Sequence, residues 1–180
     1  MIGNGEAGKS RIGANVTEEL QNNLVFTKEC VFSISKRFSI PASGVVDIVF
    51  DSTGITSDFL VFLPVFFQGF EAGPIEIDLY AGTNADDDGT EIICFNRNEL
   101  SVKPCGMKVW LNPTINDIGT KLPVEFEIPS DGTPATATLG GSAGDSIVTN
   151  INKAAKHTFR LTNIEASIAR CVIAANWFEL

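Results

Sequence analysis

The chain has 180 residues, of which 44% are hydrophobic and 19% are charged, and its formal net charge is -9 at pH 7. The 13 Lys and Arg residues are scattered, which argues against nucleic-acid binding because a protein that neutralises phosphates needs a basic stripe. No apolar run reaches the roughly 18 residues of a membrane span, so no membrane partner is expected, and the length suits one compact domain.

Residues 1–25 differ in composition from the rest and are predicted to form an extended N-terminal arm. They contain Gly3-Asn-Gly-Glu-Ala-Gly-Lys-Ser10, which matches the phosphate-binding P-loop pattern. A P-loop needs a buried strand before it and a helix after it, but only Met1 and Ile2 precede the pattern, so nucleotide binding is rejected. The arm also lacks the apolar core of a signal peptide, which predicts synthesis in a cytoplasm.

Two strands follow, over residues 30–40 and 45–51, with a turn at residues 41–44. In the first, most even positions are apolar and most odd positions are Ser or Arg, which predicts one buried and one exposed face. In the second, Val46 and Phe50 are predicted to face the same way, into the core.

Residues 59–67 are apolar at nearly every position, which suits a strand covered on both faces or one whose outer face meets another chain. Pro64 cannot donate a hydrogen bond to a sheet, so this strand is predicted to lie at an edge or to contain a bulge. Phe66, Phe67 and Phe70 beside that edge form a candidate subunit interface, and burial within the same chain is the alternative.

From residue 74 to residue 129 the sequence alternates short strand-like runs with turns rich in Asn, Asp, Gly and Pro, a pattern typical of antiparallel sheets. The predicted strands are residues 74–80, 91–96, 107–112 and 122–128. Tyr80 and Trp110 fall on the polar phase of their strands. They are candidates for stacking a sugar or anchoring a protein interface, and packing beneath the arm or a loop is the alternative.

An acidic turn between the first two of these runs imitates the opening of a calcium-binding loop, with oxygen ligands available from Asn84, Asp86 and Asp88 before Gly89. The pattern then fails, because the position that requires a bidentate Glu holds Phe95. Since Asp-Gly is a strong hairpin signal, the segment is predicted to be a solvated hairpin turn.

No group of residues predicts a cofactor, a metal site or a catalytic centre. The one histidine, His157, has no second histidine or cysteine near it in the sequence that would suggest a zinc site or a catalytic triad. The four cysteines are widely spaced and are predicted to be reduced, with a Cys94–Cys105 disulfide as the alternative. The protein is therefore predicted not to be an enzyme.

Residues 130–146 consist mainly of Gly, Ala, Ser, Thr and Asp and are predicted to form a flexible loop, because they have too little apolar surface to fold alone. Strand patterns return at residues 156–163 and 168–180. The whole pattern predicts an all-β fold, an antiparallel β-sandwich or jelly roll of about nine strands over residues 26–180.

Six short motifs follow one another along the chain: Ile77-Asp-Leu-Tyr80-Ala-Gly-Thr83, Asp88-Gly-Thr90, Phe95-Asn96-Arg97-Asn98, Asn112-Pro-Thr114, Gly119-Thr120 and Phe159-Arg-Leu-Thr-Asn163. Each alone is a turn pattern, but their order and spacing, over about residues 74–180, resemble those of β-sandwich virion proteins of tailed bacteriophages. The resemblance implies a non-enzymatic capsid decoration (cement) protein, often a homotrimer, that binds the major capsid protein on the outside of the head and stabilises it.

Two other functions fit the same residues. One is a receptor- or glycan-binding module of a phage tail or attachment apparatus, using Tyr80, Trp110 and the loop at residues 130–146. The other is a structural subunit of a tail or connector. In the decoration hypothesis, residues 1–25 reach across to adjacent subunits on the capsid, since an arm that orders on binding gains contact area without enlarging the folded core.

Overall fold

The computed structural model describes residues 28–55, 60–62, 65–70, 74–128 and 155–179, which form antiparallel sheets with no helix among them. The predicted all-β sandwich is confirmed. The predicted arm, the P-loop-like pattern within it and the predicted loop at residues 130–146 lie outside the described residues.

Thirteen strands are present in the described residues, and they form three sheets. Sheet A contains β1 (Val31–Ile40), β3 (Leu60–Phe62), β4 (Phe66–Phe70), β8 (Phe95–Asn96) and β13 (Ala169–Glu179). Sheet B contains β2 (Val45–Asp51), β5 (Ile75–Ala81), β7 (Thr90–Glu91), β9 (Lys108–Leu111), β11 (Thr120–Ile128) and β12 (Lys156–Asn163), and a small third sheet pairs β6 (Asn84–Ala85) with β10 (Ile115–Asp117). Five of these strands have only two or three residues, so their number exceeds the expectation from the sequence.

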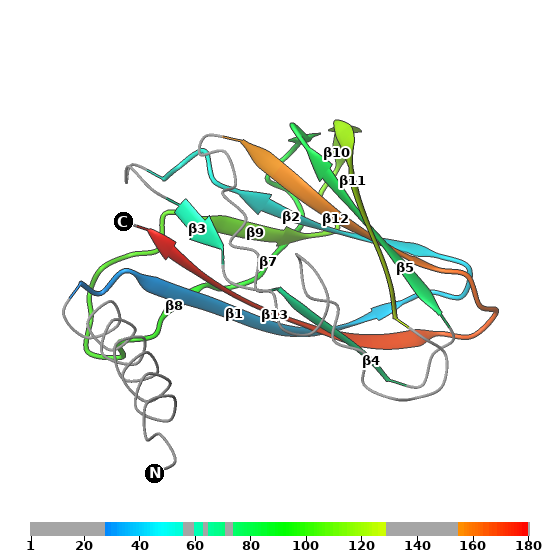
Figure 1. Cartoon of the computed structure of the whole chain (residues 1–180), viewed down its shortest axis with the longest axis horizontal. Coiled ribbons are helices and arrows are strands. Elements are labelled where there is room, and N and C mark those ends of the chain that lie inside the picture. The colour runs from blue at the N-terminus through cyan, green and yellow to red at the C-terminus, as the bar shows by residue number, and fades with distance from the viewer. Residues whose placement is uncertain (1–27, 56–59, 63–64, 71–73, 129–154, 180) are drawn as a thin grey trace, which may run out of the picture.

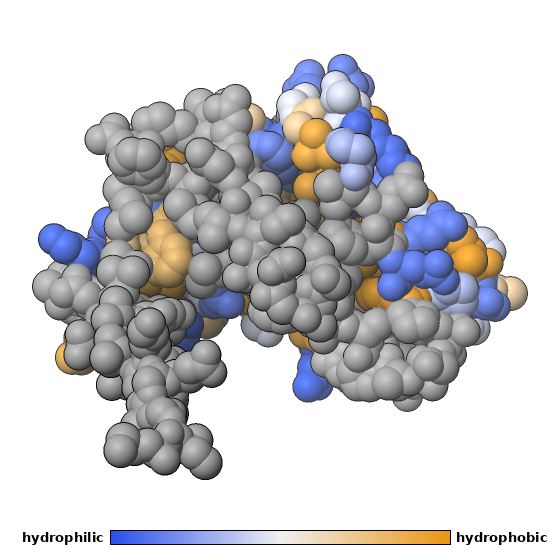
Figure 2. All heavy atoms as spheres, viewed as in Figure 1, coloured by the Kyte–Doolittle hydropathy of each residue, from blue (hydrophilic) through white to orange (hydrophobic). Residues whose placement is uncertain are grey.

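The hydrogen-bonded strand pairs are nested in the sequence: the outer strands of the chain pair with each other, and the strands just inside them pair in turn (Figure 1). β1 pairs with β13, while β2, which follows β1, pairs with β12, which precedes β13. The same nesting continues with β4 on β13 and β5 on β12, and it is the winding of a jelly roll. In the same view, hydrophobic residues of the described part reach the surface in several places (Figure 2).

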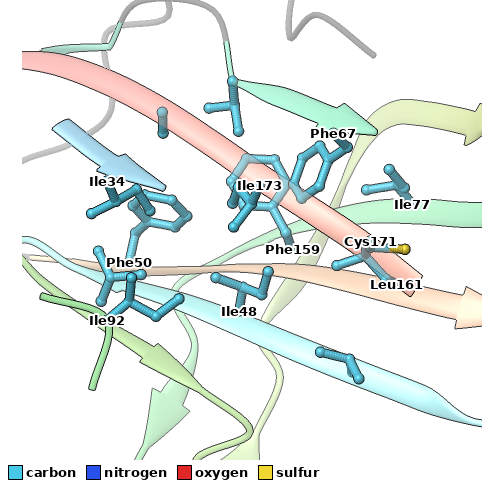
Figure 3. Packing of buried hydrophobic residues seen from close by; sticks show 14 of the residues in the cluster. Ile34, Ile48, Phe50, Phe67, Ile77, Ile92, Phe159, Leu161, Cys171 and Ile173 are labelled. Atoms are coloured by element: carbon cyan, nitrogen blue, oxygen red, sulfur yellow. The ribbon is translucent and has the colours of Figure 1, made fainter. Parts of the chain in front are cut away.

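Alternation of side chains along the strands builds a core between sheets A and B. In β13, every second residue from Ala169 to Glu179 is buried, as expected for a strand with one face against the core. Aromatic rings meet between the two sheets: the centroid of the Phe159 ring in sheet B lies 5.3 Å from that of Phe67 in sheet A, and 5.5 Å from that of Phe50 in its own sheet. Figure 3 shows these rings among the aliphatic side chains of both sheets.

The apolar run at residues 59–67 is not one strand. It forms two short strands, β3 and β4, which both pair with β13 at one edge of sheet A. Phe67 is only 2% exposed and packs in the core, so the prediction that it contributes to a subunit interface is wrong, and the alternative of burial within the chain holds. Its place on the inner phase of β4, opposite Ile173, explains this burial. The backbones of Phe66 and Phe70 belong to the same strand, whereas their side chains and Pro64 lie outside the described part.

Two further expectations are corrected. Residues 91–96 are not one strand, because β7 joins sheet B and β8 joins sheet A. The acidic turn does not close a hairpin either, since it links β6 to β7 and these strands pair with β10 and β9. Gly89 is needed there for a different reason: a Cβ at this position would lie 2.7 Å from the carbonyl oxygen of Leu111.

We expect Phe159→Ala to lower the free energy of unfolding by about 3–5 kcal/mol, because it removes the ring that packs against both Phe50 and Phe67 and leaves a cavity. The measurement is denaturant unfolding followed by tryptophan fluorescence. Phe95→Ala is the matched control: its side chain is 52% exposed, and its effect should stay within about 0.5 kcal/mol. Equal losses in the two variants would contradict this assignment of the core.

Candidate functional site

The connection between β7 and β9, residues 92–107, is here called the crossing segment, because it leaves sheet B, adds β8 to sheet A and returns. At its start, Ile92 is 3% exposed and its amide donates to the carbonyl of Val109. Phe95 and Asn96 then pair with the beginning of β1, and Met107 is buried again next to β9. The segment therefore bridges the two sheets of the sandwich.

The crossing segment exposes apolar side chains. Leu100 and Val102 are 92% and 97% exposed, Ile93 is 72% exposed and Phe95 is 52% exposed. Single exposed apolar residues are normal on a protein surface, but four within ten residues of chain are not scattered. Such a concentration marks a candidate contact surface.

Side-chain hydrogen bonds fix the tip of the crossing segment. The Asn96 Oδ1 atom accepts from the amide of Asn98 at 2.9 Å, and the Asn98 Oδ1 atom accepts from the amide of Leu100 at 3.1 Å. The Ser101 hydroxyl donates to the Glu29 carboxylate at 2.7 Å, which anchors the tip to the residues before β1. These local turns hold the backbone and satisfy its donors, so the apolar side chains are presented on an ordered loop.

The return of the crossing segment is held by the buried carboxylate of Glu179 in β13, which is 5% exposed. Its Oε1 atom accepts from the indole N–H of Trp177 at 2.9 Å and from the amide of Met107 at 3.2 Å. Its Oε2 atom accepts from the amide of Gly106 at 2.9 Å. Three N–H donors thus compensate the buried charge, and they join sheet A to the crossing segment.

A cavity of about 450 Å³ lies beside this carboxylate. Its lining residues are Gly54, Lys103, Pro104, Cys105, Gly106, Lys108 and Glu179. Because the Glu179 oxygens are already engaged by backbone and indole donors, the carboxylate has a structural role rather than that of a free catalytic group.

The two thiols of the crossing segment meet at one carbonyl oxygen. The Sγ atoms of Cys94 and Cys105 lie 3.5 Å and 3.3 Å from the Met107 oxygen, and the Cys105 thiol also lies 3.4 Å from Glu179 Oε1. The hydrogen bond with the Cys94 side chain, burial and the Glu179 charge all raise the pKa of Cys105. None of the four cysteines, all of which lie in the described part of the chain, forms a disulfide in the structure.

Tyr80 and Trp110 lie on the outer face of sheet B, both half-buried. The Arg160 guanidinium lies 5.9 Å above the Tyr80 ring and makes a two-pronged ion pair with Asp47, with both N–O distances 2.8 Å. Trp110 pairs with Val49 in β2, so β2 and β12 separate it from Tyr80, a distance of about 14 Å at the usual strand spacing. The two aromatic residues therefore do not form one stacking platform.

The carboxylates of the acidic turn serve local structure. Lys156 Nζ contacts Asp87 at 2.8 Å and the buried Asp51 at 3.3 Å. Asp88 accepts from the amide and the hydroxyl of Thr114 at 2.7 Å and 2.6 Å, and these hydrogen bonds lower the pKa of Asp88. Asp86 accepts from Asn116 at 3.0 Å. The turn is thus tied to β12, to β10 and to the residue before β10.

Within the described ranges, no group of three or more His, Cys, Asp or Glu side chains is arranged to hold a metal ion. His157 is 6% exposed in β12, and burial lowers its pKa, which favours the neutral imidazole. None of the chain's described segments is a helix long and apolar enough to cross a membrane.

The structure exposes residues that the sequence did not select as a site. Ile93, Leu100 and Val102 were not candidates, because an apolar residue in a non-alternating segment gives no sign of whether it is buried. The one available signal was their position among Asn, Lys and Pro residues, which are common in surface turns. Glu179 gave no signal, since two of its three N–H donors come from residues 73 and 72 positions away.

No protein-family model matches the sequence, and no curated protein matches it. Among solved structures, the chain is similar to the Yersinia pseudotuberculosis-derived mitogen, with a TM-score of 0.33 and 8% identity over 79% of this chain and 83% of that one. A likeness at this level carries no argument about function.

We expect Glu179→Gln to lower the free energy of unfolding by about 1–3 kcal/mol, because one of its two terminal atoms becomes an amide that faces an N–H donor. Amide hydrogen exchange at Gly106 and Met107 should become faster in the same variant. Glu165→Gln, at an exposed position, is the control and should change neither quantity. An unchanged exchange rate at Gly106 would show that the carboxylate does not hold the crossing segment.

The Lys156 cluster predicts a specific dependence of stability on pH. Burial opposes ionisation of Asp51, but hydrogen bonds from Thr53 and the charge of Lys156 outweigh it, so the pKa of Asp51 lies below its usual 3.8. Burial also disfavours the Lys156 cation, but its contacts with Asp87 and Asp51 raise its pKa above the usual 10.5. The stabilisation from this ion pair is therefore complete between pH 3.8 and pH 10.5, the usual pKa values of the two groups. It is lost in acid as the pH falls through the folded-state pKa of Asp51, and in alkali as the pH rises through the folded-state pKa of Lys156.

Lys156→Met removes the cation and keeps much of the side-chain length, and we expect it to cost about 2 kcal/mol at neutral pH. The difference between the variant and the natural protein should shrink as the pH falls below 3.8 and through the folded-state pKa of Asp51. Urea unfolding at neutral pH and over this acid range measures the difference. A difference that stayed constant with pH would mean that the lysine acts through packing alone.

Proposed function

We propose that this chain is a non-enzymatic structural protein that binds the outside of a bacteriophage capsid as a decoration (cement) protein and stabilises the head. The observation that carries the proposal is the crossing segment, which holds Leu100 and Val102 more than nine-tenths exposed on an ordered loop. An apolar cluster held in a fixed conformation binds a partner surface with little additional loss of conformational entropy.

The fold is compatible with this function. Jelly rolls occur in viral capsid domains, although they also occur in lectins, so this support is an analogy at the level of the fold. The major capsid protein is the proposed partner, and a homotrimer on the virion surface, made in the host cytoplasm, is the proposed form. Phe95 is the one aromatic residue exposed on the crossing segment, and it is the natural anchor for the contact.

The glycan- or receptor-binding alternative has less support from the geometry. Its two aromatic candidates lie about 14 Å apart on the outer face of sheet B, and Arg160 already lies over the Tyr80 ring. The third possibility, a tail or connector subunit, differs from decoration mainly in stoichiometry. Copy number in purified particles separates them: a number matching the capsomers supports decoration, and a few copies per particle support a tail or vertex part.

The test is binding to emptied heads of the phage that encodes the chain. We expect the double variant Leu100→Ser, Val102→Ser to bind at least about tenfold more weakly, since loss of a buried apolar anchor commonly costs more than 1 kcal/mol. Stability should change little, because both side chains are exposed in the isolated protein.

The matched control is Val45→Ser, Ile168→Ser, which alters two other exposed apolar residues, 46% and 62% exposed, outside the crossing segment. It should bind heads as the natural protein does. Equal loss in both double variants would remove the crossing segment as the contact surface, and failure of the natural protein to bind heads would refute the proposed function.

A further inference from the structure

Two cysteines stand at either end of the exposed part of the crossing segment. Cys94 directly precedes Phe95, and Cys105 follows Val102 by three positions, so the apolar residues Phe95, Leu100 and Val102 all lie between them. The chain turns back on itself so that both thiols approach the carbonyl oxygen of Met107, at 3.5 Å and 3.3 Å.

We propose that Cys94 and Cys105 are a redox-active pair, and that an intramolecular disulfide between them closes the loop that presents Phe95, Leu100 and Val102. The pairing chemistry stands on the geometry of the thiols alone. The consequence for binding rests on the proposed function of the crossing segment.

The pair differs from the other two cysteines in access. Cys94 and Cys105 are each partly exposed, and Cys105 lines the cavity beside Glu179, so a small reagent reaches them. Cys30 and Cys171 are both 1% exposed, so a reagent in solution does not reach them in the folded protein. Oxidation should therefore be selective for the crossing segment.

The reaction is a thiol–disulfide exchange with a low-molecular-weight disulfide, such as oxidised glutathione. In the first step the Cys94 sulfur, as its thiolate, attacks the oxidant, forming a mixed disulfide and releasing one glutathione thiolate. Cys105 then loses its proton, and its sulfur attacks the Cys94 sulfur and releases the second glutathione. The protein loses two electrons and its two thiol protons, and the oxidant gains both as two molecules of reduced glutathione.

The closed loop should change the protein in two measurable ways. Cross-linking residues 94 and 105 restricts the unfolded chain, which should raise the melting temperature by on the order of 5 °C. It also adds a covalent constraint to the hydrogen bonds that already hold residues 95–104, so the apolar side chains should be held more firmly before they meet a partner.

The experiment incubates the folded protein with oxidised glutathione, blocks the remaining thiols with an alkylating reagent, and maps the cysteines by mass spectrometry. We expect a peptide cross-linked between Cys94 and Cys105, alkylation of Cys30 and Cys171 only after unfolding, and the rise in melting temperature. Cys94→Ser and Cys105→Ser are the matched controls, and neither should show the cross-link or the temperature shift.

Stable glutathione adducts on Cys94 or Cys105 without a cross-link would overturn the proposal, as would a cross-link that forms only in denaturant. Binding to emptied heads is then compared for the reduced and oxidised protein. Oxidised protein that carries the mapped disulfide but binds heads no better than reduced protein would refute the consequence for binding and leave the disulfide standing. If neither form binds heads, the proposed function fails while the mapped disulfide is unaffected.

Discussion

The pairing of β13 with three other strands is the constraint on which the rest of the structure depends. β13 is bonded to β1 along ten residues on one side and to β3 and β4 on the other, so sheet A exists only when it is in place. Its inward residues close the core, where Trp177 contacts the rings of Phe32 and Phe50. Its last residue, Glu179, then fixes the return of the crossing segment. Loss of this strand would therefore open the core and release the candidate contact surface at once.

On the described surface, charged groups of sheet B have partners within the chain, whereas apolar side chains of the crossing segment are exposed to solvent. Charged side chains on the outer face of sheet B find partners within the chain, as Arg160 does with Asp47 and Lys156 with Asp51. The crossing segment does the reverse: its backbone and amide groups are hydrogen-bonded, while Leu100 and Val102 remain in solvent. Exposed apolar area on an ordered loop has no role in the stability of the isolated chain, which is why it supports a role in binding.

The sequence predicted the long strands well, because each has a clear period and is bounded by turn residues. The strands at residues 45–51 and 156–163 match their predicted limits. It could not predict which strands pair, since a period of two identifies a face but not a neighbour. The interruption between β7 and β8, the burial of Phe67 and the role of Glu179 all depend on contacts between distant segments. The exposure of Leu100 could not be predicted either, because an apolar residue that binds a partner looks like one that belongs to a core.

The adjacency of β1 and β13 has a consequence for the order of events during synthesis. Val31 is paired with Phe178 and Ile40 with Ala169. β1 therefore cannot pair with β13 until all of the chain between them has been translated. The β1–β13 part of sheet A therefore cannot form on the ribosome before β13 has been synthesised. Folding dominated by such distant pairings is slow, on the order of milliseconds to seconds for small β proteins, and it leaves unpaired strand edges open to aggregation meanwhile. Production of this protein in the cell therefore depends on keeping nascent chains apart from one another until β13 has been made and can pair with β1.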